Sequence, residues 1–201
     1  MPYKIKKSYR KQGYDYSLNG YYFITICTKG RKHCFGKVEK GKMILSLLGK
    51  IAVNFWIDIP KHFKHIRLGE FIIMPNHVHG IIILEDSIQS MFNDYVVETG
   101  HRTVRQNYKS SRTGQCPVPT EYKSEFGHVK SNSISTIIGS FKSICTKIIH
   151  QKYPQTNFAW QPRFHDRIIR DEEELYNIQN YIYYNPDNWY RDRNNLEDLF
   201  M

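Results

Sequence analysis

The chain has 201 residues, the length of one domain with an insertion. Its hydrophobic fraction of 40% is enough for a core and excludes wholesale disorder. A mean hydropathy of −0.57 excludes a membrane span, as does the lack of any apolar run of about 18 residues. The formal charge of +10 suggests a polyanionic partner, most often nucleic acid, although basic proteins without such a partner exist.

The cysteines and the N-terminus bear on the compartment. No two of the four cysteines have the CxxC spacing of zinc or thioredoxin-like sites, so we interpret them as packing residues in a reducing cytoplasm. Residues 1–15 are basic and lack the apolar segment of a secretory signal. They fit a solvated tail and a phosphate-contacting arm equally well.

The first half of the chain predicts three strands and a helix. Residues 21–28 are β-branched and aromatic and predict a strand. Ser46 is the predicted cap of a helix with apolar residues at helical spacing, which Pro60 should end. In residues 66–84, two apolar runs flank Pro75-Asn76, which predicts a tight antiparallel hairpin.

The second half begins with a change of composition. Residues 86–131 are polar and predict a flexible insertion without a core of its own. Residues 133–152 show an amphipathic helical period, and residues 163–170 predict a short strand. Asp171 with Glu174 forms a capping box for a last helix that ends before Pro186. The order predicts an α+β fold: a ferredoxin-like β-α-β-β-α-β sheet, with an added C-terminal helix, in a single domain of residues 1–201.

Two groups of residues carry the chemistry. His77 and His79 lie at i and i+2 of a predicted strand, so both imidazoles can reach one divalent metal. Alone, this pattern favours two structural histidines, because it is short and common by chance. Tyr181 and Asn185 are one helical turn apart on an edge of the last helix. If that helix packs over the histidines, a phenol and a carboxamide arrive beside the metal.

Three segments carry a resemblance to a known family, FIIMPNHVHGIII, WQPRFHDRIIR and NYIYYNP. With them the chain resembles the HUH single-tyrosine transposases, specifically the REP-associated tyrosine transposases. The resemblance runs from about residue 20 to 188 without the insertion. It implies a metal-dependent endonuclease and strand transferase that cuts single-stranded DNA near hairpins and forms a 5′-phosphotyrosine intermediate.

The resemblance also implies roles for individual residues. Tyr181 matches the family's nucleophile, His77 and His79 match its metal ligands, and Asn185 matches the amide that serves as third ligand. The expected ion is Mg²⁺ or Mn²⁺, and the expected partner is single-stranded DNA with a hairpin. Lys142, Arg163 and Arg167 lie in segments around the expected site and are candidate phosphate contacts, although solvated surface charge explains each nearly as well.

Several alternatives remain open from the sequence. A catalytically silent protein on the same fold would bind DNA hairpins without cutting them. A hydrolase with zinc on His77 and His79 would use water as nucleophile and would not need Tyr181. The family includes monomers and dimers, and the sequence does not decide between them.

Overall fold

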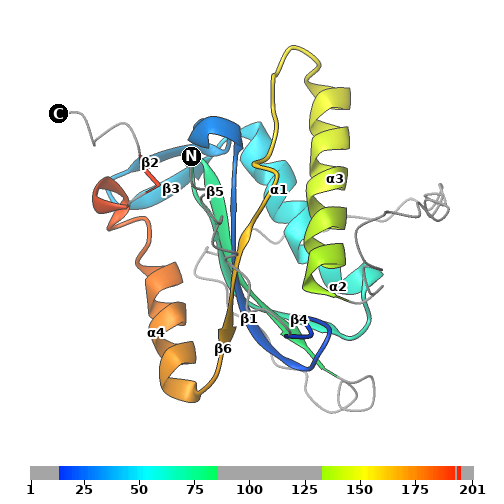
Figure 1. Cartoon of the computed structure of the whole chain (residues 1–201). Coiled ribbons are helices and arrows are strands. Elements are labelled where there is room, and N and C mark those ends of the chain that lie inside the picture. Colours follow the sequence, from blue (N-terminus) through cyan, green and yellow to red (C-terminus); the bar gives the residue numbers. More distant parts are fainter. Residues whose placement is uncertain (1–13, 86–132, 193, 196–201) are drawn as a thin grey trace, which may run out of the picture.

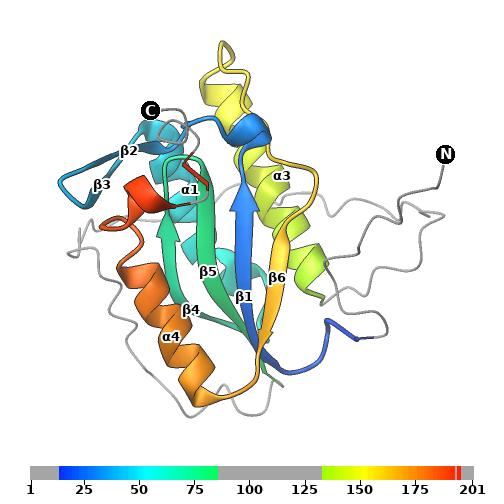
Figure 2. The ribbon, with the colours of Figure 1, turned by 60° about the vertical axis from the view of Figure 1, so that its left-hand side comes forward.

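The computed structural model describes residues 14–85, 133–192 and 194–195. Four strands form an antiparallel sheet in the order β4-β5-β1-β6. Helices α1 and α3 cover one face of this sheet and α4 covers the other (Figures 1 and 2). The strands are β1 (Gly20–Cys27), β4 (Ile66–Ile73), β5 (His77–Leu84) and β6 (His165–Ile169). The expectation of a mixed α/β protein with an antiparallel sheet is confirmed.

The predicted hairpin is formed by β4 and β5, and Pro75 and Asn76 make the turn between them. All eight residues of β5 are buried, because this strand lies between two neighbours and under helices on both faces. Gly80 makes room for one of those helices. A Cβ at Gly80 would lie 2.3 Å from the Trp56 ring, so no larger residue fits there without displacing α1.

The two faces of the sheet belong to different hydrophobic clusters. Alternate residues of β5 point in opposite directions, as strand geometry requires. Val78, Ile82 and Leu84 join the larger cluster with α1 and α3. Ile81 and Ile83 join a smaller cluster that includes Ile178 and Ile182 of α4. His77 and His79 share the face of Ile81 and Ile83, and therefore face the side of the sheet that α4 covers.

Helix α1 (Leu47–Ile57) begins where expected, because the Ser46 hydroxyl accepts a hydrogen bond from the Gly49 N–H at 3.1 Å. The prediction that Pro60 ends this helix was wrong. Helix α1 ends before Asp58, and Pro60 lies in the first turn of a second short helix, α2 (Ile59–His62). Proline is accommodated there because the first helical N–H groups have no partner within the helix.

Both later helices begin after a side chain that caps their first turn, and the Asp171 cap was predicted. Helix α3 (Ile134–Lys152) starts after Ser133, whose hydroxyl accepts from the Thr136 N–H. Helix α4 (Glu172–Tyr183) starts after Asp171, which accepts from the Glu174 N–H at 2.7 Å. The three glutamates of its first turn complement the positive end of the helix dipole.

Besides α2, four small elements in the described residues were not predicted from the sequence. Strands β2 (Gly36–Glu39) and β3 (Lys42–Leu45) lie between β1 and α1 along the chain and form a separate two-stranded sheet. The 3-10 helices η1 (Lys29–Arg31) and η3 (Trp189–Arg191) follow β1 and α4. The predicted strand at 163–170 is shorter than expected and begins at His165.

Two predicted segments lie wholly or largely outside the described residues. They are the insertion at 86–131 and positions 1–13 of the basic arm. Within the part of the chain that the structure describes, no helix combines the length and the apolar character needed to cross a membrane.

Candidate functional site

The two histidines of the HVH sequence lie at the turn end of β5, and their rings are almost wholly buried. In the register with β1, His77 is opposite Cys27 and His79 is opposite Thr25. The ring centroids of His77 and His79 are 4.3 Å apart. The strand therefore brings both imidazoles to one place, as the i, i+2 spacing predicts.

Neighbours on β1 hold the ring of His79 in place. The Thr25 hydroxyl forms a 2.8 Å hydrogen bond with His79 Nδ1, and the Phe23 ring stacks on the imidazole at a centroid distance of 5.2 Å. Because Nδ1 is used by Thr25, the other ring nitrogen, Nε2, faces α4. There the Tyr181 hydroxyl lies 3.2 Å from Nε2.

Asn76 fixes the tautomer of His77. Its side-chain Nδ2 donates to two backbone carbonyls, at 3.1 Å to Arg31 and 2.7 Å to Asn194. Carbonyl oxygens only accept, so the amide oxygen of Asn76 must face His77 Nδ1, 2.8 Å away. His77 in its neutral form therefore carries its proton on Nδ1, which gives Nε2 the lone pair. This is the arrangement of a metal-binding histidine whose second nitrogen is held by a protein acceptor.

Helix α4 and the residues just after it supply the phenol and the amide. Tyr181 is 43% exposed, which leaves its ring accessible to a substrate, whereas Asn185 is 2% exposed. The Asn185 Nδ2 donates to Asp192 Oδ2 at 3.2 Å. Among the described residues, nothing hydrogen-bonds to the buried Oδ1 of Asn185. The negative end of the α4 dipole lies nearby and favours a cation there.

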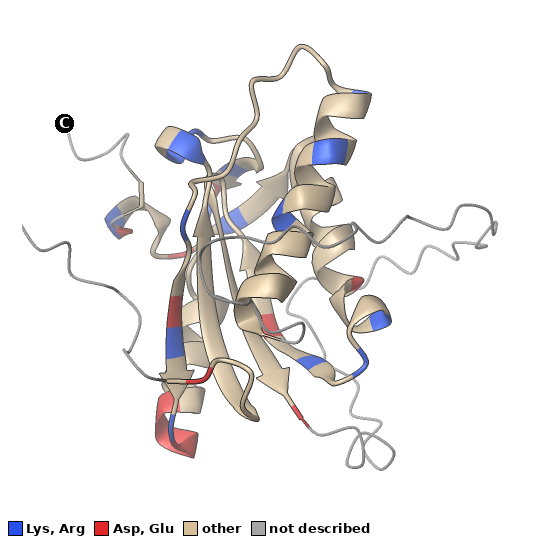
Figure 3. Ribbon diagram, turned by 45° about the vertical axis from the view of Figure 1, so that its right-hand side comes forward, with Lys and Arg blue, Asp and Glu red and all other residues tan. Residues whose placement is uncertain are grey.

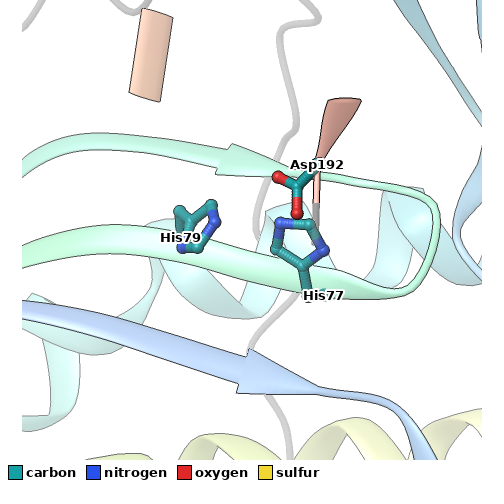
Figure 4. A group of neighbouring side chains, drawn as sticks. All are labelled: His77, His79 and Asp192. Carbon is teal, nitrogen blue, oxygen red and sulfur yellow. The ribbon is translucent and has the colours of Figure 1, made fainter. Parts of the chain in front are cut away.

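Asp192 joins this group, and the sequence did not point to it. One ligand atom from each of His77, His79 and Asp192 lies within 4.8 Å of the other two. Figure 4 shows the Asp192 carboxylate above His77, with His79 beside it. Two imidazole nitrogens, a carboxylate and a buried amide oxygen that needs a partner are donors suited to a divalent metal ion, so the residues present fit such an ion.

An open cavity of about 400 Å³ adjoins the phenol. Its walls come from α4 and from the segment that follows it. The lining residues are Tyr181, Asn185, Asn188, Arg191 and Asp192. A charged group that entered this cavity would lie against the nucleophile candidate, with the guanidinium of Arg191 at its wall.

The three basic residues predicted to contact DNA are not brought together at this site. Lys142 is on α3, and its Nζ donates to the Gln161 carbonyl at 2.6 Å and the Pro162 carbonyl at 3.1 Å. Helix α3 covers the opposite face of the sheet from α4 (Figure 2). Burial lowers the pKa of Lys142. Arg163 is exposed in the loop before β6.

Arg167 lies nearer the site. It is opposite Phe23 in the β1–β6 register, so the two side chains share one face of the sheet. It forms an ion pair with Glu174. The acidic residues gather here at the start of α4, whereas Lys and Arg are spread along α3 and the upper loops (Figure 3). The ion pair with Glu174 partly neutralises the charge of Arg167.

The contributions of Asn76, Thr25 and Asp192 to this site were not predicted from the sequence. Asn76 was interpreted only as a turn residue, although its place directly before His77 was a usable signal. Thr25 could have been found from the β1–β5 register, if the register had been known. Asp192 has no local signal, because its closeness to the histidines depends on how the C-terminal segment folds back over the sheet.

Comparisons with known proteins give relatives in both sequence and structure. No protein-family model matches the chain. An uncharacterized protein of Haemophilus influenzae is 31% identical over 190 residues, which cover 94% of this chain and 92% of the relative. A second protein of the same strain, named "Putative REP-associated tyrosine transposase", is 25% identical over 120 residues, or 52% of this chain and 66% of the relative.

Among solved structures, a REP-associated tyrosine transposase bound to a REP hairpin has the same fold. Its TM-score is 0.51 at 15% sequence identity, and the match covers 90% of this chain and 74% of that chain. The sheet and its helices thus share the fold of that transposase. The chain therefore belongs to one family with the uncharacterized Haemophilus influenzae protein, and it is similar in sequence and fold to REP-associated tyrosine transposases.

Proposed function

We propose that the chain is a metal-dependent single-stranded DNA endonuclease and strand transferase that cleaves near DNA hairpins. The observation that carries this proposal is the 3.2 Å contact between the Tyr181 hydroxyl and His79 Nε2. Two segments 102 positions apart meet there, beside an open cavity. A phenol that is partly exposed and close to two metal-type donors is suited to nucleophilic attack on a phosphodiester.

The fold supports a relationship to the HUH nucleases. The order β4-β5-β1-β6 corresponds to a ferredoxin-like sheet, in which two helices cover one face. In this interpretation α4 is the added C-terminal helix, and it carries the tyrosine over the opposite face. The HVH residues lie on the central strand β5, where their positions are rigid.

We propose His77, His79 and Asn185 as ligands of Mg²⁺ or Mn²⁺. The hydrogen bonds of His77 Nδ1 to Asn76 and of His79 Nδ1 to Thr25 support this. They leave Nε2 of each ring as the nitrogen that would bind the ion. The buried Oδ1 of Asn185 would be the third donor. When bound, the ion would polarise the scissile phosphate, favour ionisation of the nearby phenol and stabilise charge in the transition state.

Tyr181 acts as the nucleophile in this proposal. Its oxygen attacks the phosphorus and forms a new P–O bond, while the bond from phosphorus to the 3′ oxygen breaks. The leaving 3′ oxygen takes up a proton, so the products are a free 3′ hydroxyl and a 5′ phosphate on Tyr181. The number of phosphoester bonds is unchanged, which lets the reverse reaction join the phosphate to another 3′ hydroxyl without ATP.

The proposed substrate is single-stranded DNA that carries a hairpin. The formal charge of +10 supports binding of a polyanion, and a structural neighbour binds a REP hairpin. Lys142, Arg163 and Arg167 remain proposed phosphate contacts at the edges of the DNA, away from the reacting atoms. The proposal is compatible with both a monomer and a homodimer.

The test is a suicide assay. A labelled single-stranded oligonucleotide with a hairpin, taken from palindromic repeats near the gene, is incubated with protein and Mn²⁺. The wild type should yield a covalent band, and Tyr181→Phe should abolish it while hairpin binding persists. Tyr183→Phe and Tyr184→Phe are matched controls, since both tyrosines are more exposed than Tyr181 and lie within one helical turn of it. If Tyr181→Phe still forms the band, the assignment fails.

A further inference from the structure

Asp192 lies in the segment after η3, and its backbone and side chain are both held locally. Its N–H donates to the Trp189 carbonyl at 3.0 Å. Its Oδ1 accepts from the Asn194 N–H at 2.7 Å. The carboxylate is therefore fixed by short-range contacts, and its position does not depend on a long flexible side chain.

The second carboxylate oxygen points to the candidate metal site. Asp192 Oδ2 accepts a hydrogen bond from Asn185 Nδ2 at 3.2 Å. An amide that donates from its nitrogen on one side must direct its oxygen elsewhere, and Oδ1 of Asn185 is buried. Asp192 thus determines which way the Asn185 amide is turned.

Asp192 is also close enough to ligate an ion itself. Donors around one six-coordinate Mg²⁺ or Mn²⁺ ion are about 3 Å apart for neighbours and about 4 Å apart for opposite positions, given bonds of about 2.1 Å. One oxygen of Asp192 lies within 4.8 Å of the ligand nitrogens of His77 and His79. Small side-chain adjustments bring all three donors to such distances.

We propose that Asp192 is a fourth protein ligand of the divalent ion, and that it gives the site its only anionic donor among the described residues. This inference rests on the proposed function for the ion's identity. A hard carboxylate oxygen shifts a two-histidine site towards Mg²⁺ and Mn²⁺ and away from zinc or copper, which imidazole alone would favour. It also holds the ion before DNA arrives, because one unit of negative charge offsets half of the ion's charge.

The competing explanation is that Asp192 only folds the C-terminal segment over the sheet. The two explanations differ in how Mn²⁺ changes stability. A ligand raises the melting temperature of the loaded protein through its affinity. A purely structural residue lowers the melting temperature of the metal-free protein and leaves the increase caused by Mn²⁺ unchanged.

The experiment is Mn²⁺ titration by calorimetry and by thermal unfolding, without DNA, on the full chain. Asp192→Asn should weaken Mn²⁺ binding about tenfold or more and reduce the Mn²⁺-induced increase in melting temperature. Asp187→Asn makes the same change at an exposed position of the same segment and should leave binding within about twofold of wild type. Asp192→Glu keeps the charge and should recover binding relative to Asp192→Asn.

Three outcomes decide the matter. The proposal is supported if Asp192→Asn weakens Mn²⁺ binding and Asp187→Asn does not. Equal Mn²⁺ affinity and an equal Mn²⁺-induced increase in melting temperature in wild type and Asp192→Asn overturn it, while the proposed function stands. If wild type takes up no Mn²⁺ at millimolar concentration, the metal-dependent function fails together with this inference.

Discussion

Asn76 offers a sharp test of how the histidines are prepared for a metal ion. The residue is fully buried, and its side chain takes part in three hydrogen bonds. Two of them tie the β4–β5 turn to the backbone of Arg31 and Asn194, and the third holds His77. Substitution Asn76→Ala removes all three and frees the His77 ring to adopt the other tautomer.

The size of the effect follows from these contacts. Each hydrogen bond of this kind is worth about 1 kcal/mol, so Asn76→Ala should lower the free energy of unfolding by about 3 kcal/mol. Loss of a hydrogen bond to a metal-ligating histidine typically lowers metal affinity by about 10- to 100-fold. The two effects are separable, because stability is measured without metal and affinity is measured on the folded variant.

Urea unfolding and Mn²⁺ calorimetry give the two numbers. The ¹⁵N shifts of the His77 ring report the tautomer, and the wild type should carry its proton on Nδ1. Asn188→Ala is the control, because Asn188 is exposed and its Nδ2 bonds only a local carbonyl, that of Tyr184. A folded Asn76→Ala variant with wild-type Mn²⁺ affinity, or a wild-type His77 protonated on Nε2, would show that Asn76 does not prepare His77 for a metal ion.

Two further predictions concern packing and metal dependence. Gly80→Ala should destabilise the fold by about 1–3 kcal/mol in urea unfolding, because its Cβ meets Trp56. Gly139 is an exposed position of α3 with open space around it, so Gly139→Ala should be neutral or stabilising by up to about 1 kcal/mol; equal effects of the two substitutions would contradict this packing argument. Chelation with EDTA should abolish the covalent DNA band, and added Mn²⁺ should restore it. A band that survives chelation would exclude a metal-dependent cleavage.

The elements that could be predicted are those with local signals. Ser46 and Asp171 cap helices within three residues of themselves, and Pro75-Asn76 makes a turn between its own neighbours. Short-range patterns of this kind do not depend on the rest of the fold. These elements could therefore be predicted from the sequence.

What was missed depends on contacts between distant segments or on weak local patterns. Asn76 and the Asn194 carbonyl that it binds are 118 positions apart. Asp192 reaches the histidines only because the chain turns back after α4. The β2–β3 strands of four residues each are too short for alternation to identify them. Tyr181 and Asn185 were correctly placed on or beside one helix. The sequence did not establish that this helix packs over His79.

Mass spectrometry of the digested protein–DNA adduct tests most directly whether Tyr181 is the nucleophile. A suicide oligonucleotide traps the intermediate, and nuclease treatment leaves a short 5′-linked nucleotide on the peptide. We expect this nucleotide on Tyr181 in the wild type. Attachment to Tyr183 or Tyr184, or cleaved DNA with no protein-linked nucleotide, would contradict it.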